Sequence, residues 1–181
     1  MRGLFQTLLA LILIAGSGGQ AAAASPSTST DLVVVMKSER VLYLYQAGHV
    51  VAQYPVALGA SPRGTKQMAG DNKTPIGAYT LDWRNPNSDF HRSLHISYPD
   101  TEDRAQAAVL GVPPGSNIMI HGQPSYDDRL RTGDWTNGCI AVSDAAIDDI
   151  PIQRLIHVDG AHGLGRGTQG IQPVRVNRAD G

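Results

Sequence analysis

The sequence predicts a mainly β fold with a few short helices. The chain carries 20 glycines and 11 prolines among its 181 residues, which is typical of a protein with many turns. Short runs of β-branched and aromatic residues lie between these turns, as expected for strands. Hydrophobic residues make up 41% of the chain and charged residues 17%, so the composition supports a buried core and argues against a disordered chain.

Charge and cysteine content exclude several classes of function. The formal net charge is −1, which argues against a nucleic-acid-binding protein that relies on neutralising phosphates. The chain has one cysteine, Cys139, so neither an intrachain disulfide nor a cysteine-based zinc site can form. A length of 181 residues suits one domain with a substantial core.

The N-terminal residues have the pattern of an export signal. Arg2 precedes an apolar run over residues 4–15, and small residues lead up to Ala24. The apolar run is too short for a stable membrane span. We therefore expect a cleaved signal peptide over residues 1–24 and a flexible linker over 25–30. The mature protein is then expected in the periplasm and meets the membrane only during export; an uncleaved anchor is the alternative.

The segment after the linker alternates expected strands with turns. The expected strands cover residues 32–36, 41–45, 49–58, 77–83, 94–98, 117–121 and 139–142. Residues 31–158 are expected to form the folded domain. Residues 159–181 are a Gly-rich segment of unassigned structure, with 174–176 as a candidate last strand.

Two capping residues mark the expected helices. Asp100 precedes a segment with acidic residues in its first turn, and Gly111 ends it. Ser143 begins a second helix, which Pro151 interrupts because proline lacks the backbone donor that a helix needs.

Two other patterns are too weak to carry a function. Residues 59–66 resemble a phosphate-binding loop, but the order Gly-Thr-Lys replaces Gly-Lys-Ser/Thr, and a proline stands where backbone amides would bind phosphate. His91 and His95 have the spacing of a zinc pair on a helix, but no glutamate lies between them and the next residues have the pattern of a strand. We expect neither a metal nor a cofactor.

The most informative residue is Cys139. A free thiol in an exported protein is exposed to oxidation, so it is usually either buried and inert or retained for chemistry. Cys139 follows Gly138 and precedes an apolar strand, a position where backbone amides such as that of Gly138 converge and can stabilise an oxyanion. His121 also ends an apolar strand, so the imidazole and the thiol meet if the two strands are neighbours. His121 is therefore the candidate general base, and we expect a thiolate–imidazolium pair at neutral pH.

Five blocks of residues occur in an order that matches a known family. They are Gly70-Asp-Asn-Lys-Thr-Pro-Ile-Gly-Ala-Tyr79, Ser97-Tyr98-Pro99, Pro114-Gly115-Ser116-Asn117-Ile118, His121-Gly122 and Thr136-Asn137-Gly138-Cys139-Ile140. With these blocks the sequence resembles the L,D-transpeptidase (YkuD-type) catalytic domain over about residues 31–150. The blocks at 70–75 and 134–136 are most similar to the subgroup that includes peptidoglycan–lipoprotein amidases.

The resemblance implies a mixed β-sandwich with Cys139 as nucleophile and His121 as general base, in a groove under a loop. It also implies that the backbone carbonyl of Gly122 orients the imidazole. The implied reaction is attack on the amide between the third and fourth stem residues of peptidoglycan. D-Alanine leaves, a thioester forms at Cys139, and the amine of a diaminopimelate on a neighbouring stem resolves the thioester.

Two alternatives follow from the same pair of residues. Resolution of the thioester by water would make the protein a hydrolase or amidase that releases a stem residue or a wall-linked lipoprotein. The other alternative is an inert wall-binding module, against which the intact Cys139 and His121 argue.

The sequence departs from the family at two positions beside the nucleophile. Many members carry His before the Gly-Cys pair and Asn or Arg two residues after the cysteine, whereas this chain has Asn137 and Ala141. We expect Thr136 and Asn137 to contact the substrate.

Basic residues in the 59–74 loop are further candidates for substrate binding, because stem peptides carry carboxylates. They are Arg63, Lys66 and Lys73. The alternative is that this loop is an ordinary solvated turn.

Overall fold

The computed structural model describes residues 30–160 except 128, 130 and 153, and within them it contains eight strands and two helices. In chain order these are β1 (Leu32–Met36), β2 (Val41–Gln46), β3 (His49–Pro55), β4 (Gly77–Asn85), β5 (Ser93–Ile96), α1 (Thr101–Val109), β6 (Met119–His121), β7 (Ile140–Ala141), α2 (Asp144–Asp149) and β8 (Arg154–Asp159). The predicted export signal over 1–24, the linker up to residue 29 and the segment from residue 161 lie outside the described residues.

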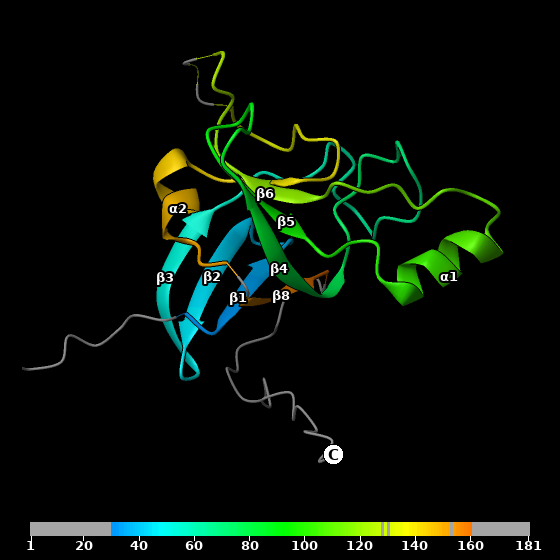
Figure 1. The fold of residues 1–181 in the computed structure, drawn as a ribbon, viewed down its shortest axis with the longest axis horizontal. Coiled ribbons are helices and arrows are strands. Elements are labelled where there is room, and N and C mark those ends of the chain that lie inside the picture. The colour runs from blue at the N-terminus through cyan, green and yellow to red at the C-terminus, as the bar shows by residue number, and fades with distance from the viewer. Residues whose placement is uncertain (1–29, 128, 130, 153, 161–181) are drawn as a thin grey trace, which may run out of the picture.

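The strands form one curled, mixed sheet (Figure 1) in the order β3-β2-β1-β8-β4-β5-β6-β7. β1 runs parallel to β8 and β6 parallel to β7, while the other neighbouring pairs are antiparallel. The prediction of a mainly β fold with short helices is confirmed. The sheet curls until its two ends meet: Ala57, just after β3, and Ala141 of β7 exchange two backbone hydrogen bonds of 2.9 and 2.8 Å. The two layers of the expected sandwich are therefore the two halves of one continuous sheet.

An apolar core fills the inside of the curl. In β2, Leu42 and Leu44 are buried while Tyr43 and Tyr45 are partly exposed, which is the alternation that a strand with one buried face requires. Complete burial of a Leu or Ile side chain contributes about 1.5–3 kcal/mol to the folded state. The largest fully buried side chains are Leu42, Leu58, Leu81, Leu94, Ile96, Ile120, Ile140, Ile147, Ile150, Ile156, Val33 and Val35.

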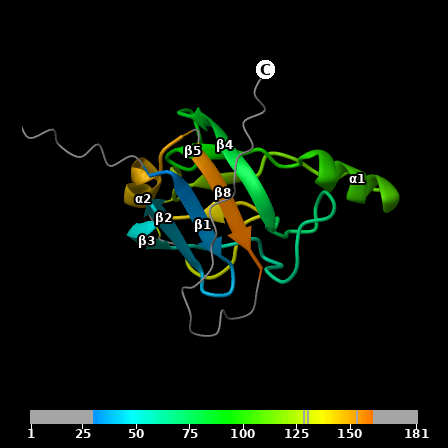
Figure 2. The same cartoon turned by 90° about the horizontal axis from the view of Figure 1, so that it is seen from below.

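β8 is an element that the sequence analysis did not assign. It lies between β1 and β4 (Figure 2), so residues that follow Pro151 form a central strand of the sheet. Ile156 and Val158 are buried, whereas Leu155 and His157 are exposed. The alternation of apolar and other residues over the six residues of β8 was the feature of the sequence that could have identified this strand. The candidate last strand at 174–176 lies outside the described residues.

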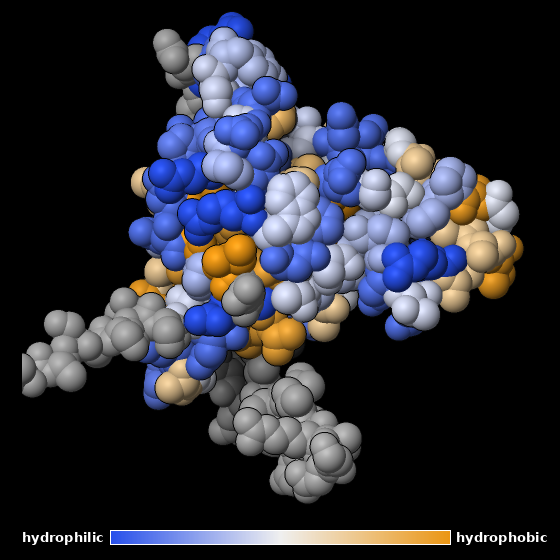
Figure 3. All heavy atoms as spheres, in the orientation of Figure 1, coloured by the Kyte–Doolittle hydropathy of each residue, from blue (hydrophilic) through white to orange (hydrophobic). Residues whose placement is uncertain are grey.

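Both predicted helix caps are present. The Asp100 side chain accepts a hydrogen bond from the Asp103 backbone N–H, and the Asp103 side chain accepts one from the Asp100 N–H, which forms a capping box. The Ser143 side chain caps α2 by accepting a hydrogen bond from the Ala146 backbone N–H at 3.2 Å. α1 projects from the body of the molecule, and apolar side chains gather at its free end (Figure 3), where Val109 is 88% exposed. Of the described helices, none has the length and apolar character needed to cross a bilayer.

Two carboxylates fasten the two long loops. Asp71 lies within the 59–74 loop and accepts hydrogen bonds from the backbone N–H groups of Gln67 (2.8 Å) and Lys73 (3.1 Å). Asp134 lies at the end of the loop between β6 and β7. It accepts three side-chain hydrogen bonds of 2.7 to 3.1 Å from Arg40 and one of 2.9 Å from the Leu58 N–H. Asp71 thus holds the 59–74 loop together internally, and Asp134 connects the end of the β6–β7 loop to the β1–β2 turn and to the segment after β3.

Candidate active site

The parallel pair β6 and β7 brings His121 and Cys139 onto one face of the sheet. Ile120 pairs with Ile140 and His121 pairs with Ala141, so Cys139 lies level with Met119 on the neighbouring strand. Ile120 and Ile140 are 0% exposed and point into the core. Because side chains alternate along a strand, His121 and Cys139 point to the opposite face. The two strands are neighbours, as the sequence analysis required for a Cys–His pair.

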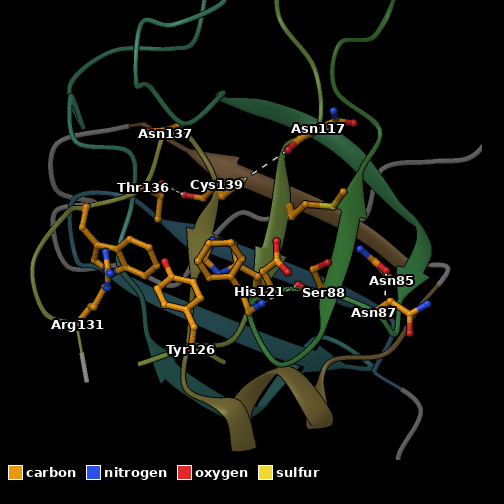
Figure 4. A pocket seen from close by; sticks show the side chains of 15 residues that line it. Asn85, Asn87, Ser88, Asn117, His121, Tyr126, Arg131, Thr136, Asn137 and Cys139 are labelled. Atoms are coloured by element: carbon orange, nitrogen blue, oxygen red, sulfur yellow. Dashed lines mark hydrogen bonds between the residues drawn. The ribbon is translucent and has the colours of Figure 1, made fainter. Parts of the chain in front are cut away.

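His121 and Cys139 lie in a groove of about 700 Å³ (Figure 4). Asn85 and Asn87 stand on one side of the groove, and Arg131 stands on the other. The groove is lined by Asn85, Asn87, Ser88, Asp89, Phe90, Ser93, Asn117, Met119, His121, Tyr126, Arg131, Trp135, Thr136, Asn137 and Cys139. The loop between β4 and β5 and the loop between β6 and β7 therefore form its walls.

The His121 ring is held in one tautomer. Its Nδ1 lies 2.8 Å from the backbone carbonyl oxygen of Gly122. A carbonyl can only accept, so Nδ1 carries the hydrogen and Nε2 keeps its lone pair as a base. The side chain is 4% exposed and packs against Phe90 and Trp135, at ring-centroid distances of 4.5 and 5.6 Å. This burial lowers the pKa of His121, with the hydrogen bond to Gly122 acting in the opposite direction.

Gly122 has a steric reason to be glycine, whereas its hydrogen bond to His121 uses a backbone carbonyl that any residue would supply. A Cβ at this position would lie 2.4 Å from Oδ1 of Asp144 and 3.0 Å from Cβ of His91. Asp144 begins α2 and accepts the Gln123 backbone N–H at 2.7 Å. The start of α2 therefore packs directly against the backbone that orients His121.

The Cys139 thiol is partly exposed to the groove. Its Sγ lies 3.7 Å from the backbone carbonyl oxygen of Asn117 (Figure 4). Desolvation raises the pKa of Cys139, while a hydrogen bond from the Met119 backbone and the charge of Lys66 act in the opposite direction. The two shifts at Cys139 and His121 favour a neutral thiol beside a neutral imidazole at rest. Both shifts act against the thiolate–imidazolium pair expected from the sequence, because burial disfavours both charges.

Thr136 holds the turn that presents the nucleophile. Its side chain is buried; its Oγ1 accepts the Gly138 N–H at 3.1 Å and donates to the Cys139 carbonyl at 2.7 Å. The hydroxyl is thus occupied within the turn, although Thr136 also lines the groove, so the structure gives it a structural role and its predicted contact with substrate stays a prediction. The Gly138 N–H is engaged by the same hydroxyl, so the structure gives it a role in the turn and does not leave it free for an oxyanion. Asn137, by contrast, is exposed and lines the groove.

Glycine is required at position 138 by the backbone conformation there and by the atoms packed against it. Its φ is +124°, a conformation that favours glycine, and a Cβ there would lie 2.7 Å from the Lys73 carbonyl oxygen. The 59–74 loop therefore packs behind the turn that carries Cys139.

The basic residues of the 59–74 loop do not line the groove. Lys66 is 5% exposed and donates to the carboxylate of Asp71 at 2.9 Å and to the carbonyl of Met68 at 3.0 Å. Its ammonium is thus paired inside the loop, which corrects its assignment to substrate binding. Arg63 is exposed and Lys73 half-buried, and neither lines the groove, so their predicted role in substrate binding stays a prediction.

The sequence analysis missed the side chains that build the groove's walls. Phe90 and Trp135 pack against His121, and Tyr126 packs against Phe90. Arg131 lies with its guanidinium carbon 5.0 Å from the Trp135 ring centre. The walls come from loops far apart in sequence, so no local pattern identifies them. The sequence did offer a signal at Asn117, because asparagine is one of the few residues that readily adopt a left-handed backbone. The structure shows this backbone at Asn117, whose φ is +59°.

The two histidines rejected as a zinc pair have other partners. His95 Nδ1 lies 2.7 Å from Asp82, and His91 Nε2 lies 3.3 Å from Asp148. Among the described residues, no three His, Cys, Asp or Glu side chains are placed to hold a metal ion.

Comparison with known proteins gives a family and a fold. Residues 30–151 match the model of the L,D-transpeptidase catalytic domain family, YkuD. Among solved structures, the helical cell shape determining protein Pgp2 from Campylobacter jejuni is 24% identical, with a TM-score of 0.58 over 74% of this chain and 49% of that chain. Bd1075 of Bdellovibrio bacteriovorus is 24% identical, with a TM-score of 0.54 over 73% of this chain and 48% of that chain. The chain thus spans about half the length of these two proteins, which share its fold. A sequence comparison with curated proteins returns no match.

Proposed function

This chain belongs to the L,D-transpeptidase catalytic domain family, and from that premise we propose that it is a periplasmic cysteine acyltransferase acting on peptidoglycan stem peptides. The observation that carries the proposal is the fixed tautomer of His121. The hydrogen bond from Nδ1 to the Gly122 carbonyl leaves Nε2 as the basic nitrogen of the ring, on the same sheet face as Cys139. The site then contains a nucleophile, a base and a group that orients the base.

The reaction begins with a neutral pair. As Sγ of Cys139 attacks the scissile carbonyl carbon, Nε2 of His121 takes the thiol proton. The tetrahedral intermediate collapses, the C–N bond breaks, and the imidazolium returns the proton to the departing D-alanine amine. A thioester to the diaminopimelate carboxyl group remains on Cys139.

The second half of the reaction resolves the thioester. The side-chain amine of a diaminopimelate on a neighbouring stem attacks the thioester carbonyl, and Nε2 takes a proton from the attacking nitrogen. The C–S bond then breaks, and the proton passes to the departing sulfur, which restores the thiol. Water in place of the amine would give a free carboxyl group, which is the hydrolase or amidase alternative. A wall-linked lipoprotein is a candidate partner in that case.

Export to the periplasm is part of the proposal. It rests on the pattern of residues 1–24, with Arg2 before an apolar run and small residues up to Ala24. Peptidoglycan, the proposed substrate, lies in the compartment to which such a signal leads. Fractionation of cells that express the full chain, with the N-terminal residue of the mature protein determined, tests this part.

Incubation of the purified protein with isolated sacculi, followed by muropeptide analysis, tests the reaction. We expect new 3→3 cross-links with the unaltered protein and none with Cys139→Ala. Shortened stems without cross-links would show the hydrolase, and release of lipoprotein would show the amidase. Identical muropeptides with and without the protein would contradict the proposed activity.

A further inference from the structure

Arg131 stands out in the groove because of its charge. Among the described lining residues it is the only Lys or Arg, and Asp89 is the only carboxylate. The side of the groove opposite Arg131 presents the uncharged amides of Asn85 and Asn87 (Figure 4). A negatively charged group that enters the groove is therefore attracted to the Arg131 side and repelled by Asp89.

The backbone and side chain of Arg131 are positioned by neighbours that leave the guanidinium largely unpaired. The Arg131 N–H donates to Oε1 of Gln123 at 3.2 Å, and Nε2 of Gln123 donates to the Val142 carbonyl at 2.8 Å, which ties this part of the loop to the end of β7. The guanidinium lies over the Trp135 ring at 5.0 Å, within cation–π range.

The one ion pair of Arg131 within the described residues is long. Its Nη2 lies 3.9 Å from Asp127, and that carboxylate already accepts hydrogen bonds of 3.0 and 3.2 Å from Arg129. The Arg131 side chain is 38% exposed. A guanidinium has five N–H donors in a planar fork, so most of the donors of Arg131 remain available to a ligand.

The proposed substrate carries a carboxylate at the matching place. In a stem peptide that ends in D-alanine, the terminal carboxylate is attached to the same carbon as the nitrogen of the scissile amide. When the scissile carbonyl lies at Cys139, this carboxylate also lies inside the groove. A planar guanidinium binds a carboxylate through two parallel hydrogen bonds.

We propose that Arg131 binds the terminal α-carboxylate of the donor stem peptide and so selects stems whose leaving residue is the last one. The inference rests on the proposed function for the identity of the ligand. Arg131 is here a specificity-determining residue that does not take part in proton transfer.

The test compares two donors that differ in one group. One is a synthetic stem peptide ending in D-alanine, and the other is the same peptide ending in D-alaninamide. Binding of both to Cys139→Ala is measured by calorimetry, and kcat/KM for both is measured with active protein. Arg131→Gln is compared with Arg92→Gln, which removes the same charge from a side chain that pairs with Asp148 outside the groove.

We expect the chain with Arg131 to prefer the carboxylate donor by about 10-fold or more, because hydrogen bonds to charged groups contribute more than neutral ones. Arg131→Gln is expected to abolish the preference by lowering binding and kcat/KM for the carboxylate donor far more than for the D-alaninamide donor, and Arg92→Gln is expected to keep the preference. An unchanged preference in Arg131→Gln, an equal loss for both donors, or no binding of either peptide would overturn the inference. If the peptides bind with the expected preference and neither is cleaved, the proposed activity fails and the role of Arg131 stands.

Discussion

His121 determines the protonation chemistry of the site through two opposed effects. Its hydrogen bond to the Gly122 carbonyl fixes the tautomer and favours the charged ring, while burial among Phe90 and Trp135 disfavours it. Burial has the larger effect and lowers the pKa of His121, and it raises the pKa of Cys139. Both shifts favour the neutral imidazole and the neutral thiol, which is why the proposed mechanism has the nucleophile lose its proton as it reacts.

This arrangement predicts the pH profile of Cys139 alkylation. We expect the midpoint of the pH profile for alkylation by iodoacetamide to lie above the ordinary thiol pKa of about 8.5, because the raised pKa means that the thiolate forms only at higher pH. His121→Ala admits water beside the thiol, so the midpoint is expected to fall toward the ordinary value, while turnover falls by about 100-fold or more. The measurement is alkylation rate against pH, followed by mass spectrometry of Cys139.

The exposed His49 provides the control, since His49→Ala removes an imidazole outside the groove and is expected to leave the midpoint in place. A wild-type midpoint below the ordinary thiol value that rises in His121→Ala would show a resting thiolate–imidazolium pair and contradict the prediction.

The turn between the β6–β7 loop and β7 is the element that presents the nucleophile. One hydroxyl, that of Thr136, bonds both the Gly138 N–H and the Cys139 carbonyl, and it does so in a buried position. Gly138 adopts a backbone that favours glycine, with the Lys73 carbonyl packed against it. The turn therefore depends on the Thr136 hydroxyl, which pairs two of its backbone groups, and on the glycine backbone at Gly138, which leaves room for the Lys73 carbonyl.

Replacing Thr136 distinguishes a structural role from substrate binding. Thr136→Val keeps the shape but leaves a buried N–H and a buried carbonyl without partners, at a cost of about 1–3 kcal/mol for each unpaired group. We expect a lower melting temperature and slower labelling or acylation of Cys139, whereas Thr136→Ser is expected to stay close to wild type. Thermal unfolding and kcat/KM are measured together. A raised KM with unchanged melting temperature would instead show Thr136 as a substrate contact.

The whole molecule is closed by contacts between its N-terminal hairpin and the loops around the site. Lys37, directly after β1, is 4% exposed and donates to the carbonyls of Gly64 and Thr74, at 2.7 Å each. It connects the middle of the sheet to the loop that packs behind Gly138. Burial, together with the nearby charge of Arg40, lowers the pKa of Lys37 from 10.5 to about 8.

The lowered pKa of Lys37 predicts how stability depends on pH. Between about pH 8 and 10.5 the unfolded chain keeps a proton at Lys37 that the folded chain has lost, so the free energy of unfolding rises with pH in that window. We expect the free energy of unfolding to rise more with pH in wild type than in Lys37→Met, in which the titrating group is absent. Urea unfolding of both proteins from pH 7.5 to 10 measures the difference, in which the common contribution of the tyrosines cancels. Parallel curves for the two proteins would show that Lys37 keeps an ordinary pKa.

Several features follow from short-range rules and were predicted from the sequence. Strands at 32–36 and 41–45 need only β-branched or alternating residues between turns, and the helix after Asp100 needs only its capping box and Gly111. The placement of His121 and Cys139 on neighbouring strands was predictable because each residue lies at an end of a short apolar strand and beside a glycine. These features depend on neighbours within a few residues, so their physical causes are visible in the sequence.

Other features depend on which segments, far apart in sequence, pack against one another. Only the tertiary structure decided these features. β8 is central because β1 and β4, which are both far from it in sequence, pair with its two edges. Lys66 is buried with Asp71 and so is removed from substrate binding, while Arg131 reaches the groove from a loop with no distinctive local pattern. The tertiary structure also shifts the pKa of His121 down and that of Cys139 up, because the free energy of a charge depends on the solvent around it and not on the residues beside it in the chain.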